Sequence, residues 1–483
     1  MAAMEDRMDH KADQKVDHKA SWLTLRQSGA MGRFALLCLG VWLHAADSLV
    51  TATLVPAIVG DIGGIAYVAW TIALYQIGAI VAGAATGSMC QRLGVKRTLT
   101  IAALVYGLGC VVAALAPEMA MLLGARLIQG MGGGMLLSLS YIAIQQSFPA
   151  HLWSRLFGIE AAIWGAGSLL GPLIGGVLGG QGLWRGAFWL FAAQAGVLWL
   201  LATTLYPAQP IGARSGGAWP LKSIILLSAA TLLIAQAGVT SHMATSILTC
   251  MAGLALLFLA VKSDGRSRSR LFPEGTTKFG HPVGAGLAMI FALCLATTGF
   301  WAYGPLLLKT MFGIEPVVSG YILAGESFAW SFATLLVSSA PLCADRKLIR
   351  LGSVLAALGA AGLAVVVPVG SLAGMVVCAT LQGLGFGFFW PSLMQRIVRF
   401  SNEGDRTLAA AAPGNVARIG YAVGAAASGI AANMSGLAEG VSMEAARMAG
   451  FWVFAAFVPV LMMGVIAAWR FTMPASQGPG AKA

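Results

Sequence analysis

The sequence predicts an all-α polytopic membrane protein with fourteen transmembrane helices. Of its 483 residues, 58% are hydrophobic and only 10% are charged, whereas soluble domains carry about 25% charged residues. Glycine, which lets membrane helices pack closely, accounts for 62 residues. A surface with so few charges must face lipid for the most part. We therefore expect a lipid bilayer, and no nucleic acid, as the partner of this basic chain.

Apolar segments of the required length set the predicted spans, since a membrane helix needs about 20 mostly apolar residues. The predicted spans are residues 33–58, 66–89, 98–116, 119–146, 156–180, 186–206, 221–238, 244–262, 282–309, 316–342, 349–368, 371–396, 408–434 and 448–470. They divide the chain into a cytosolic tail (1–32), a six-helix bundle (33–206), two inserted helices with linkers (207–281), a second six-helix bundle (282–470) and a cytosolic tail (471–483).

The distribution of basic residues supports this topology, because cytoplasmic loops collect Lys and Arg. With both termini in the cytoplasm, 25 of the 30 basic residues lie on the inside, and only Arg185, Lys309 and Arg447 lie outside. The other two, Arg126 and Arg418, lie within spans. We expect a multi-pass protein of the cell inner (cytoplasmic) membrane, acting as a monomer.

An internal repeat relates the two bundles. Gln129-Gly130 in the fourth span recurs as Gln382-Gly383 in the twelfth, an offset of 253 residues, and the same offset relates glycines of the fifth and thirteenth spans. Two similar bundles in parallel orientation are a transporter architecture, with the binding site between them near the middle of the membrane.

The fifth span carries the most specific pattern. Gly167, Gly171 and Gly175 repeat at four-residue spacing and share one helix face, which permits close packing against another helix. Pro172 releases a backbone hydrogen bond beside them, and Gly176 follows. We expect a dry, tightly packed seam that prevents ion leakage between the bundles; a plain packing face is the alternative.

Two further motifs lie nearby. The junction of the second and third spans reads Gly87-Ser-Met-Cys-Gln91-Arg92-Leu-Gly94, which is either a cytoplasmic gate or a simple anchor for positive charge.

The fourth span carries Arg126-Leu-Ile-Gln129-Gly130. An arginine inside the membrane must find a partner or water, and a structural bond to carbonyl groups would also satisfy it.

Taken together, these motifs resemble the major facilitator superfamily, in particular its fourteen-helix drug:proton antiporter branch. The resemblance implies a major-facilitator-like fold, a gating role for the loop motif, proton coupling for the fourth span and antiport for the fifth. Gln91 stands where the family motif has Asp, and Ala52 stands at a usually polar position.

Ionisable residues inside spans are hypotheses for functional sites. Asp47 lies near the middle of the first span, where burial favours protonation when water is excluded. His44 is three residues earlier on the same helix face. We expect Asp47 to carry the proton, assisted by His44, Arg126 and Glu326; a self-satisfied polar pair is the alternative. Glu160, close to a span end, is interpreted as wetted.

A set of aromatic residues is predicted to line the substrate cavity. Equally, these residues could anchor the protein in lipid or belong to its core. They are Trp70, Tyr75, Trp164, Trp301 and Trp330.

The function predicted from these features is proton-coupled export of small amphipathic compounds or drugs, with protons and a small molecule as partners. Neither a cofactor nor a metal is expected, because nucleotide-binding, HExxH and paired-cysteine motifs are absent from the sequence. The alternatives are a metabolite or siderophore exporter with the same coupling, a polytopic membrane enzyme, and a transporter-like sensor.

Overall fold

The computed structural model describes residues 30–148, 153–206, 221–237, 243–267, 270–337, 340, 342–439 and 442–473. Most of the two predicted cytosolic tails and the linker residues 207–220 lie outside the described residues. The described elements are helices, as expected for a chain whose backbone polar groups must be satisfied within lipid.

The first bundle contains α2 (Ala30–Ile62), η1 (Ile65–Tyr67), α3 (Val68–Ala114), α4 (Met119–Ser147), α5 (Trp153–Gly180) and α6 (Trp184–Leu205). The inserted helices are α7 (Leu221–Ala237) and α8 (Met243–Asp264). The second bundle contains α9 (Pro282–Phe312), α10 (Pro316–Val337), η3 (Leu342–Ala344), α11 (Asp345–Val369), α12 (Leu372–Phe400), η4 (Glu403–Asp405), α13 (Arg406–Ala432), η5 (Asn433–Leu437), α14 (Met443–Ala455) and α15 (Val458–Thr472).

The fourteen predicted spans all coincide with helices. The long helix α3 contains the second and third spans, which meet at Gly94, where φ is 79° and a residue with a side chain would be strained. The last span is divided between α14 and α15. Among the described residues, twelve helices are long and apolar enough to cross a membrane. The remaining two are the short α7 and the more polar α13, which carries Asn415 and Arg418.

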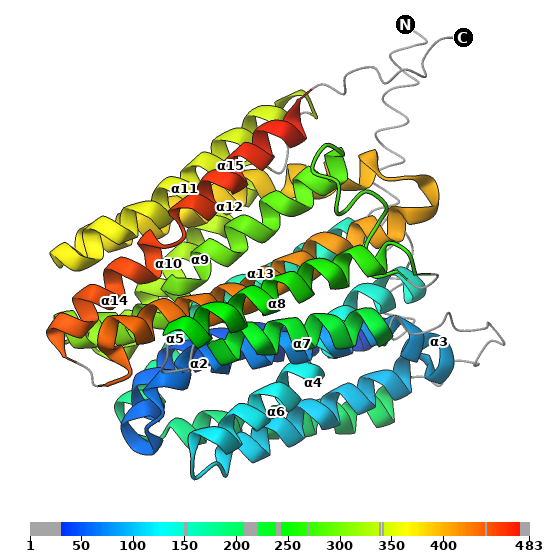
Figure 1. The fold of residues 1–483 in the computed structure, drawn as a ribbon. Helices are drawn as coiled ribbons and strands as arrows, with labels where there is room; N and C mark the ends of the chain where they lie inside the picture. The colour runs from blue at the N-terminus through cyan, green and yellow to red at the C-terminus, as the bar shows by residue number, and fades with distance from the viewer. Residues whose placement is uncertain are drawn as a thin grey trace, which may run out of the picture.

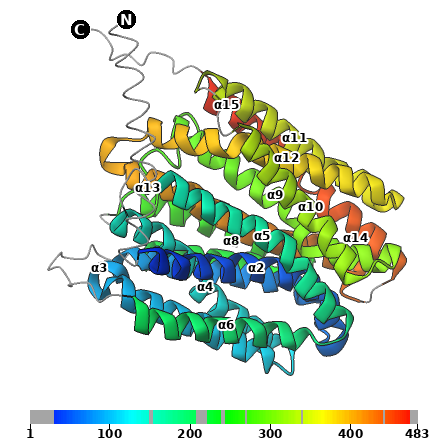
Figure 2. The same ribbon diagram turned by 180° about the vertical axis from the view of Figure 1, so that it is seen from behind.

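The two bundles lie side by side, with α2 to α6 in the lower part of Figure 1 and α9 to α15 in the upper part. The inserted helices α7 and α8 cross the front of this view between the bundles, and α7 contacts both α3 and α13. From behind, α2 and α5 are the helices of the first bundle nearest α9 and α10 (Figure 2). The predicted arrangement of two bundles with an inserted pair is confirmed.

A short polar linkage fastens the inserted helices to the second bundle. Asp264 at the end of α8 accepts hydrogen bonds from Ser223 Oγ and from the backbone amides of Leu271 and Phe272. Arg270 then pairs with Asp405 of η4 at 2.9 Å. Because these bonds join α8 to the loop before α13, the inserted pair is tied to the second bundle at this end.

The internal repeat is present in three dimensions. A Cβ atom at Gly130 would lie 2.0 Å from the carbonyl oxygen of Tyr75, and one at Gly383 would lie 2.0 Å from the carbonyl oxygen of Glu326. In both bundles, therefore, only glycine permits the backbone of the repeated Gln-Gly pair to approach its neighbouring helix.

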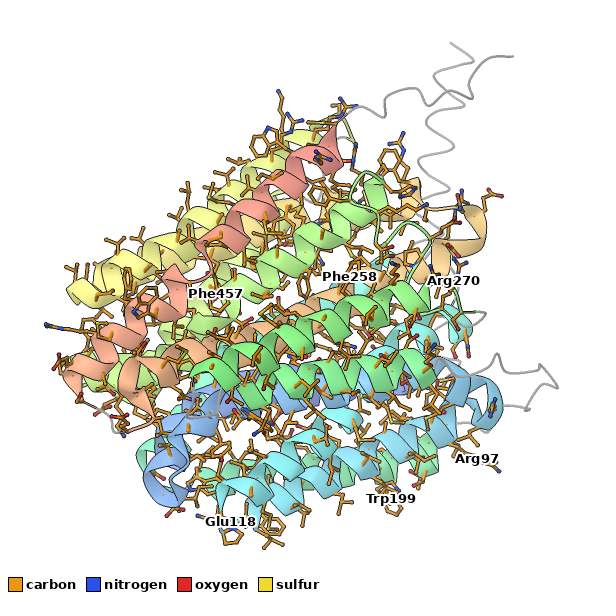
Figure 3. The ribbon with its side chains drawn as sticks, in the orientation of Figure 1. Arg97, Glu118, Trp199, Phe258, Arg270 and Phe457 are labelled. Atoms are coloured by element: carbon orange, nitrogen blue, oxygen red, sulfur yellow. The ribbon has the colours of Figure 1, made fainter. Side chains whose placement is uncertain are left out.

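Charged residues identify the two ends of the molecule. Arg97 and Arg270 lie at one end, and Glu118 lies at the other (Figure 3). Phe258 of α8 is 58% exposed on the outer surface, as expected where side chains face lipid. We refer below to the Arg97 end and the Glu118 end.

Candidate functional site

A buried polar cluster lies between α2, α3 and α4. Arg126 Nη1 donates to Asp47 Oδ2 at 2.8 Å and to Gln129 Oε1 at 2.7 Å. Gln129 Nε2 and Thr51 Oγ1 donate to Asp47 Oδ1 at 3.1 and 3.3 Å. Asp47 and Gln129 are fully buried, and Arg126 is 2% exposed. The ion pair and its hydrogen bonds offset the cost of placing both charges in lipid.

The remaining bonds of Arg126 go to α3. Its Nε donates to the carbonyl oxygen of Thr71 at 3.2 Å, and its guanidinium lies 4.3 Å from the ring centroid of Tyr75. The predicted need of Arg126 for a partner is thus met by a carboxylate, an amide, a carbonyl and an aromatic face. Three helices, α2, α3 and α4 itself, supply the partners of this one side chain.

His44 belongs to a second, adjoining arrangement. Its Nδ1 shares a 2.8 Å hydrogen bond with the hydroxyl of Tyr75, and the two rings stack with centroids 5.5 Å apart. Trp164 packs edge-on against the imidazole at 5.7 Å. The helix face shared by His44 and Asp47 does not make them hydrogen-bond partners among the described residues. Instead, Tyr75 connects them. Its hydroxyl shares the hydrogen bond with His44, and its ring lies against the guanidinium of Arg126, which pairs with Asp47.

The second bundle holds a simpler site. Gln382 Nε2 donates to Glu326 Oε1 at 2.6 Å, and the indole of Trp301 lies beside the same carboxyl group. Glu326 is 4% exposed and Gln382 is fully buried. Among the described residues, Glu326 forms no ion pair, and its Oε2 has no hydrogen-bond partner.

The glycine motif of α5 packs against two different helices. Cβ atoms at Gly171 and Gly175 would lie 2.7 Å from Leu49 Cβ and 2.0 Å from Thr53 Oγ1, both in α2 of the same bundle. At Gly167, the nearest atom, Ala45 Cβ of α2, would be an ordinary 3.5 Å away. The predicted seam between the bundles is therefore wrong for this face, because the face is turned toward α2.

The seam between the bundles is formed by the other two residues of the motif. A Cβ at Gly176 would lie 2.4 Å from Val317 Cα, and one at Gly320 would lie 2.5 Å from Pro172 Cβ. The same Cβ at Gly320 would lie 2.5 Å from Cγ2 of Thr53 in α2. These contacts close the Glu118 end between α5 and α10.

The junction motif lies at the Arg97 end. Arg92 is exposed, Gly94 has the positive φ given above, and open space surrounds the position of a Cβ at Gly87. The side chain of Gln91 lies outside the described residues.

The predicted cavity aromatics are not brought together into one wall. Trp164 and Tyr75 meet at His44, whereas Trp70 packs against the cores of both bundles. Trp330 stacks on Phe386 with centroids 4.9 Å apart, inside the second bundle.

Sequence reasoning missed two of the groups that complete these sites. Thr51 lies one turn beyond Asp47, and that spacing was available as a signal. Gln382 was noted only as part of the repeat. Its partnership with Glu326 follows if a repeated Gln-Gly pair is expected to hold an acid in each bundle.

Within the described residues, no group of His, Cys, Asp or Glu is arranged to hold a metal ion.

Comparison with known proteins places this geometry in a family. Residues 37–340 match the Major Facilitator Superfamily. The chain is 30% identical over 476 residues to a probable multidrug-efflux transporter of Mycobacterium tuberculosis, covering 94% of this chain and 96% of that protein. It is 24% identical over 302 residues to the multidrug efflux pump SdrM of Staphylococcus aureus, covering 61% of this chain and 66% of the pump.

Solved structures share the fold. A D-xylose–proton symporter superposes with a TM-score of 0.63 at 17% identity, covering 92% of this chain and 97% of the symporter. A POT family transporter in complex with a thioalcohol-conjugated peptide gives a TM-score of 0.64 at 14% identity, covering 91% and 96%. At these identities the similarity concerns the fold alone.

Proposed function

The chain belongs to the Major Facilitator Superfamily, and we propose that it exports small amphipathic compounds in exchange for protons. It is a multi-pass membrane transporter and not an enzyme, as its family and its multidrug-efflux relatives indicate. The names of those relatives support drugs or similar compounds as substrates. In this proposal the substrate binds between the two bundles, which rock against each other.

The observation that carries the proposal is the buried Asp47 and its ion pair with Arg126. Asp47 is fully buried near the middle of α2, where placing a carboxylate costs free energy. Ionisable residues at such positions mark functional sites. Protonation of Asp47 would remove its charge and weaken the 2.8 Å bond to Arg126. Because that bond joins α2 to α4, the proton would change how α2 is held in the first bundle.

Helix α2 connects Asp47 to the contact between α5 and α10. Thr53 lies six residues further along α2 and touches both Gly175 of α5 and Gly320 of α10. A small rotation of α2 on protonation would therefore disturb the contact that closes the Glu118 end. In this proposal Asp47 is the principal proton carrier, His44 and Tyr75 connect it to water, and Glu326 is a second protonatable group.

The orientation follows from charge. We propose that the Arg97 end is cytoplasmic, that both tails are cytosolic, and that the protein acts as a monomer in the cell inner membrane. The conformation closed between α5 and α10 is then the one closed to the outside.

Proteoliposomes test the function. The full-length protein should accumulate a fluorescent amphipathic dye in an acidic lumen, and a protonophore should abolish accumulation. Asp61→Asn is a matched control, since Asp61 lies on the same helix but is exposed and pairs with Arg185; this variant should transport normally. Accumulation that is equal with and without the proton gradient would refute proton exchange.

A further inference from the structure

Arg418 is a charged side chain within the spans that the proposed coupling does not use. It lies near the middle of α13 and is half-buried. A Cβ at Gly83 of α3 would lie 3.2 Å from Arg418 Nη1 and 2.9 Å from Ser138 Oγ of α4. The guanidinium of this second-bundle residue therefore reaches across to the first bundle.

No described carboxylate neutralises this charge. Among the residues that the structure describes, the ion pairs are those of Arg126, Arg185, Arg270 and Arg406. Among the described groups, Tyr75, Tyr141 and His44 interact electrostatically with Arg418. Arginine stays protonated in proteins, so a permanent positive charge lies between the bundles, and none of the described residues is its anion. Such a charge within a membrane protein is costly and calls for a partner.

The surroundings of Arg418 suit an amphipathic molecule. Tyr141 of α4 is 43% exposed and Trp164 of α5 is 36% exposed. Tyr141 interacts electrostatically with Arg418 of the other bundle, so the tyrosine lies near the guanidinium. Trp164 adjoins His44, which also interacts with Arg418. One cation flanked by accessible aromatic rings matches a ligand with an acidic group on an apolar body.

Glu160 is the main competitor for this charge. It lies one turn before Trp164 on α5 and interacts with Tyr141. Its expected wetted position is wrong, because Glu160 is only 3% exposed. Its carboxyl group forms no ion pair with Arg418 in this structure, although the two lie on opposite bundles around Tyr141. A permanent Glu160–Arg418 pair is therefore not what occupies the guanidinium here.

We propose that Arg418 binds the carboxylate of the transported compound, so that the substrates include amphipathic acids. This inference rests on the proposed export function and specifies its substrate class. A charge-assisted hydrogen bond to a desolvated guanidinium favours an acid over its neutral ester. The substrate also becomes the counterion that joins α13 to the first bundle, which couples its binding to the position of both bundles.

The test compares binding of pyrenebutyrate and its methyl ester to the full-length protein in nanodiscs of neutral lipid, without a pH gradient. The wild type should bind the acid about tenfold or more tightly than the ester. Arg418→Gln should remove that preference while leaving ester affinity within about twofold, which also reports a folded site. Arg418→Lys should retain part of the preference, and Arg185→Gln, at the Glu118 end, should retain all of it.

Two results overturn the proposal. One is a wild type without preference for the acid. The other is a preference that survives Arg418→Gln, which would leave Arg418 as the counterion of Glu160 in another conformation. Because binding is measured without a gradient, failure here leaves proton-driven transport untouched. Conversely, loss of gradient-driven transport would leave the acid preference measurable.

Discussion

The two bundles use the same repeated glutamine to hold two different acids. In the first bundle, Gln129 shares Asp47 with a guanidinium and a hydroxyl, so the carboxylate has three donor groups, one of which is a cation. In the second, Gln382 is the donor to Glu326, and none of the described cations pairs with it. The backbone contact beneath each glutamine is nearly the same. A duplicated scaffold thus keeps its packing while its electrostatics diverge, which suits one bundle to a charge-dependent latch and the other to a neutral acid.

The largest expected difference between the bundles is in stability. Asp47→Ala leaves Arg126 buried without its counterion, which should cost about 3–5 kcal/mol of unfolding free energy. Glu326→Ala leaves no charge behind and should cost less, about 1–3 kcal/mol, through the cavity and the unpaired Gln382. Unfolding of the full-length protein in mixed micelles would measure both. Asp47→Ala/Arg126→Leu should recover much of the first loss, whereas equal losses in the two bundles would contradict the comparison.

Packing within a bundle and packing between the bundles should fail in different ways. Gly171→Leu should overpack the α5–α2 contact and destabilise the first bundle by about 1–3 kcal/mol. Gly176→Leu should instead hold α5 away from Val317 of α10, so that the protein inserts normally but fails to close its Glu118 end and loses transport. Transport assays with parallel unfolding curves distinguish the two. Gly180→Leu, which meets open space, is the matched control; normal transport by Gly176→Leu would refute the inter-bundle seam.

Two cysteines related by the repeat offset should differ in reactivity. Cys343 is exposed, whereas Cys90 is 6% exposed and lies between the spans Ile65–Gly87 and Arg92–Ala114. Burial raises the pKa of the Cys90 thiol to about 11. Since the thiolate is the reactive form, Cys90 should react about a hundredfold more slowly than an ordinary thiol at neutral pH. Its rate should rise about tenfold per pH unit until the pH approaches that pKa.

The measurement uses single-cysteine variants and a membrane-impermeant maleimide. Cys343 should react in inside-out vesicles and not in intact cells, which tests the proposed cytoplasmic location of the Arg97 end. Labelling of Cys343 from outside would reverse the topology. Equal rates for Cys90 and Cys343 would show that the two loops are equally open.

The sequence predicted the helices better than their partners. Long apolar windows and the split of basic charge fix spans without tertiary information, and the repeat fixes the two bundles. Pairing depends on the rotation of each helix about its axis, which hydrophobicity scarcely constrains in a helix buried on many sides. Asp47 and Arg126 were each identified, but their 79-residue separation hid the bond. Likewise, the glycine spacing of α5 defined a face without saying whether α2 or α10 lies against it.

Whether Asp47 carries the proton can be measured by separating gradient-driven transport from substrate exchange. Wild type, Asp47→Asn and Glu326→Gln are reconstituted in proteoliposomes, and gradient-driven accumulation is compared with substrate counterflow in the absence of a gradient. Asp47→Asn should keep counterflow and lose accumulation, whereas Glu326→Gln should keep both in part. Full gradient-driven accumulation by Asp47→Asn would show that Asp47 does not carry the proton. Loss of accumulation in Glu326→Gln alone would assign proton binding to the second bundle.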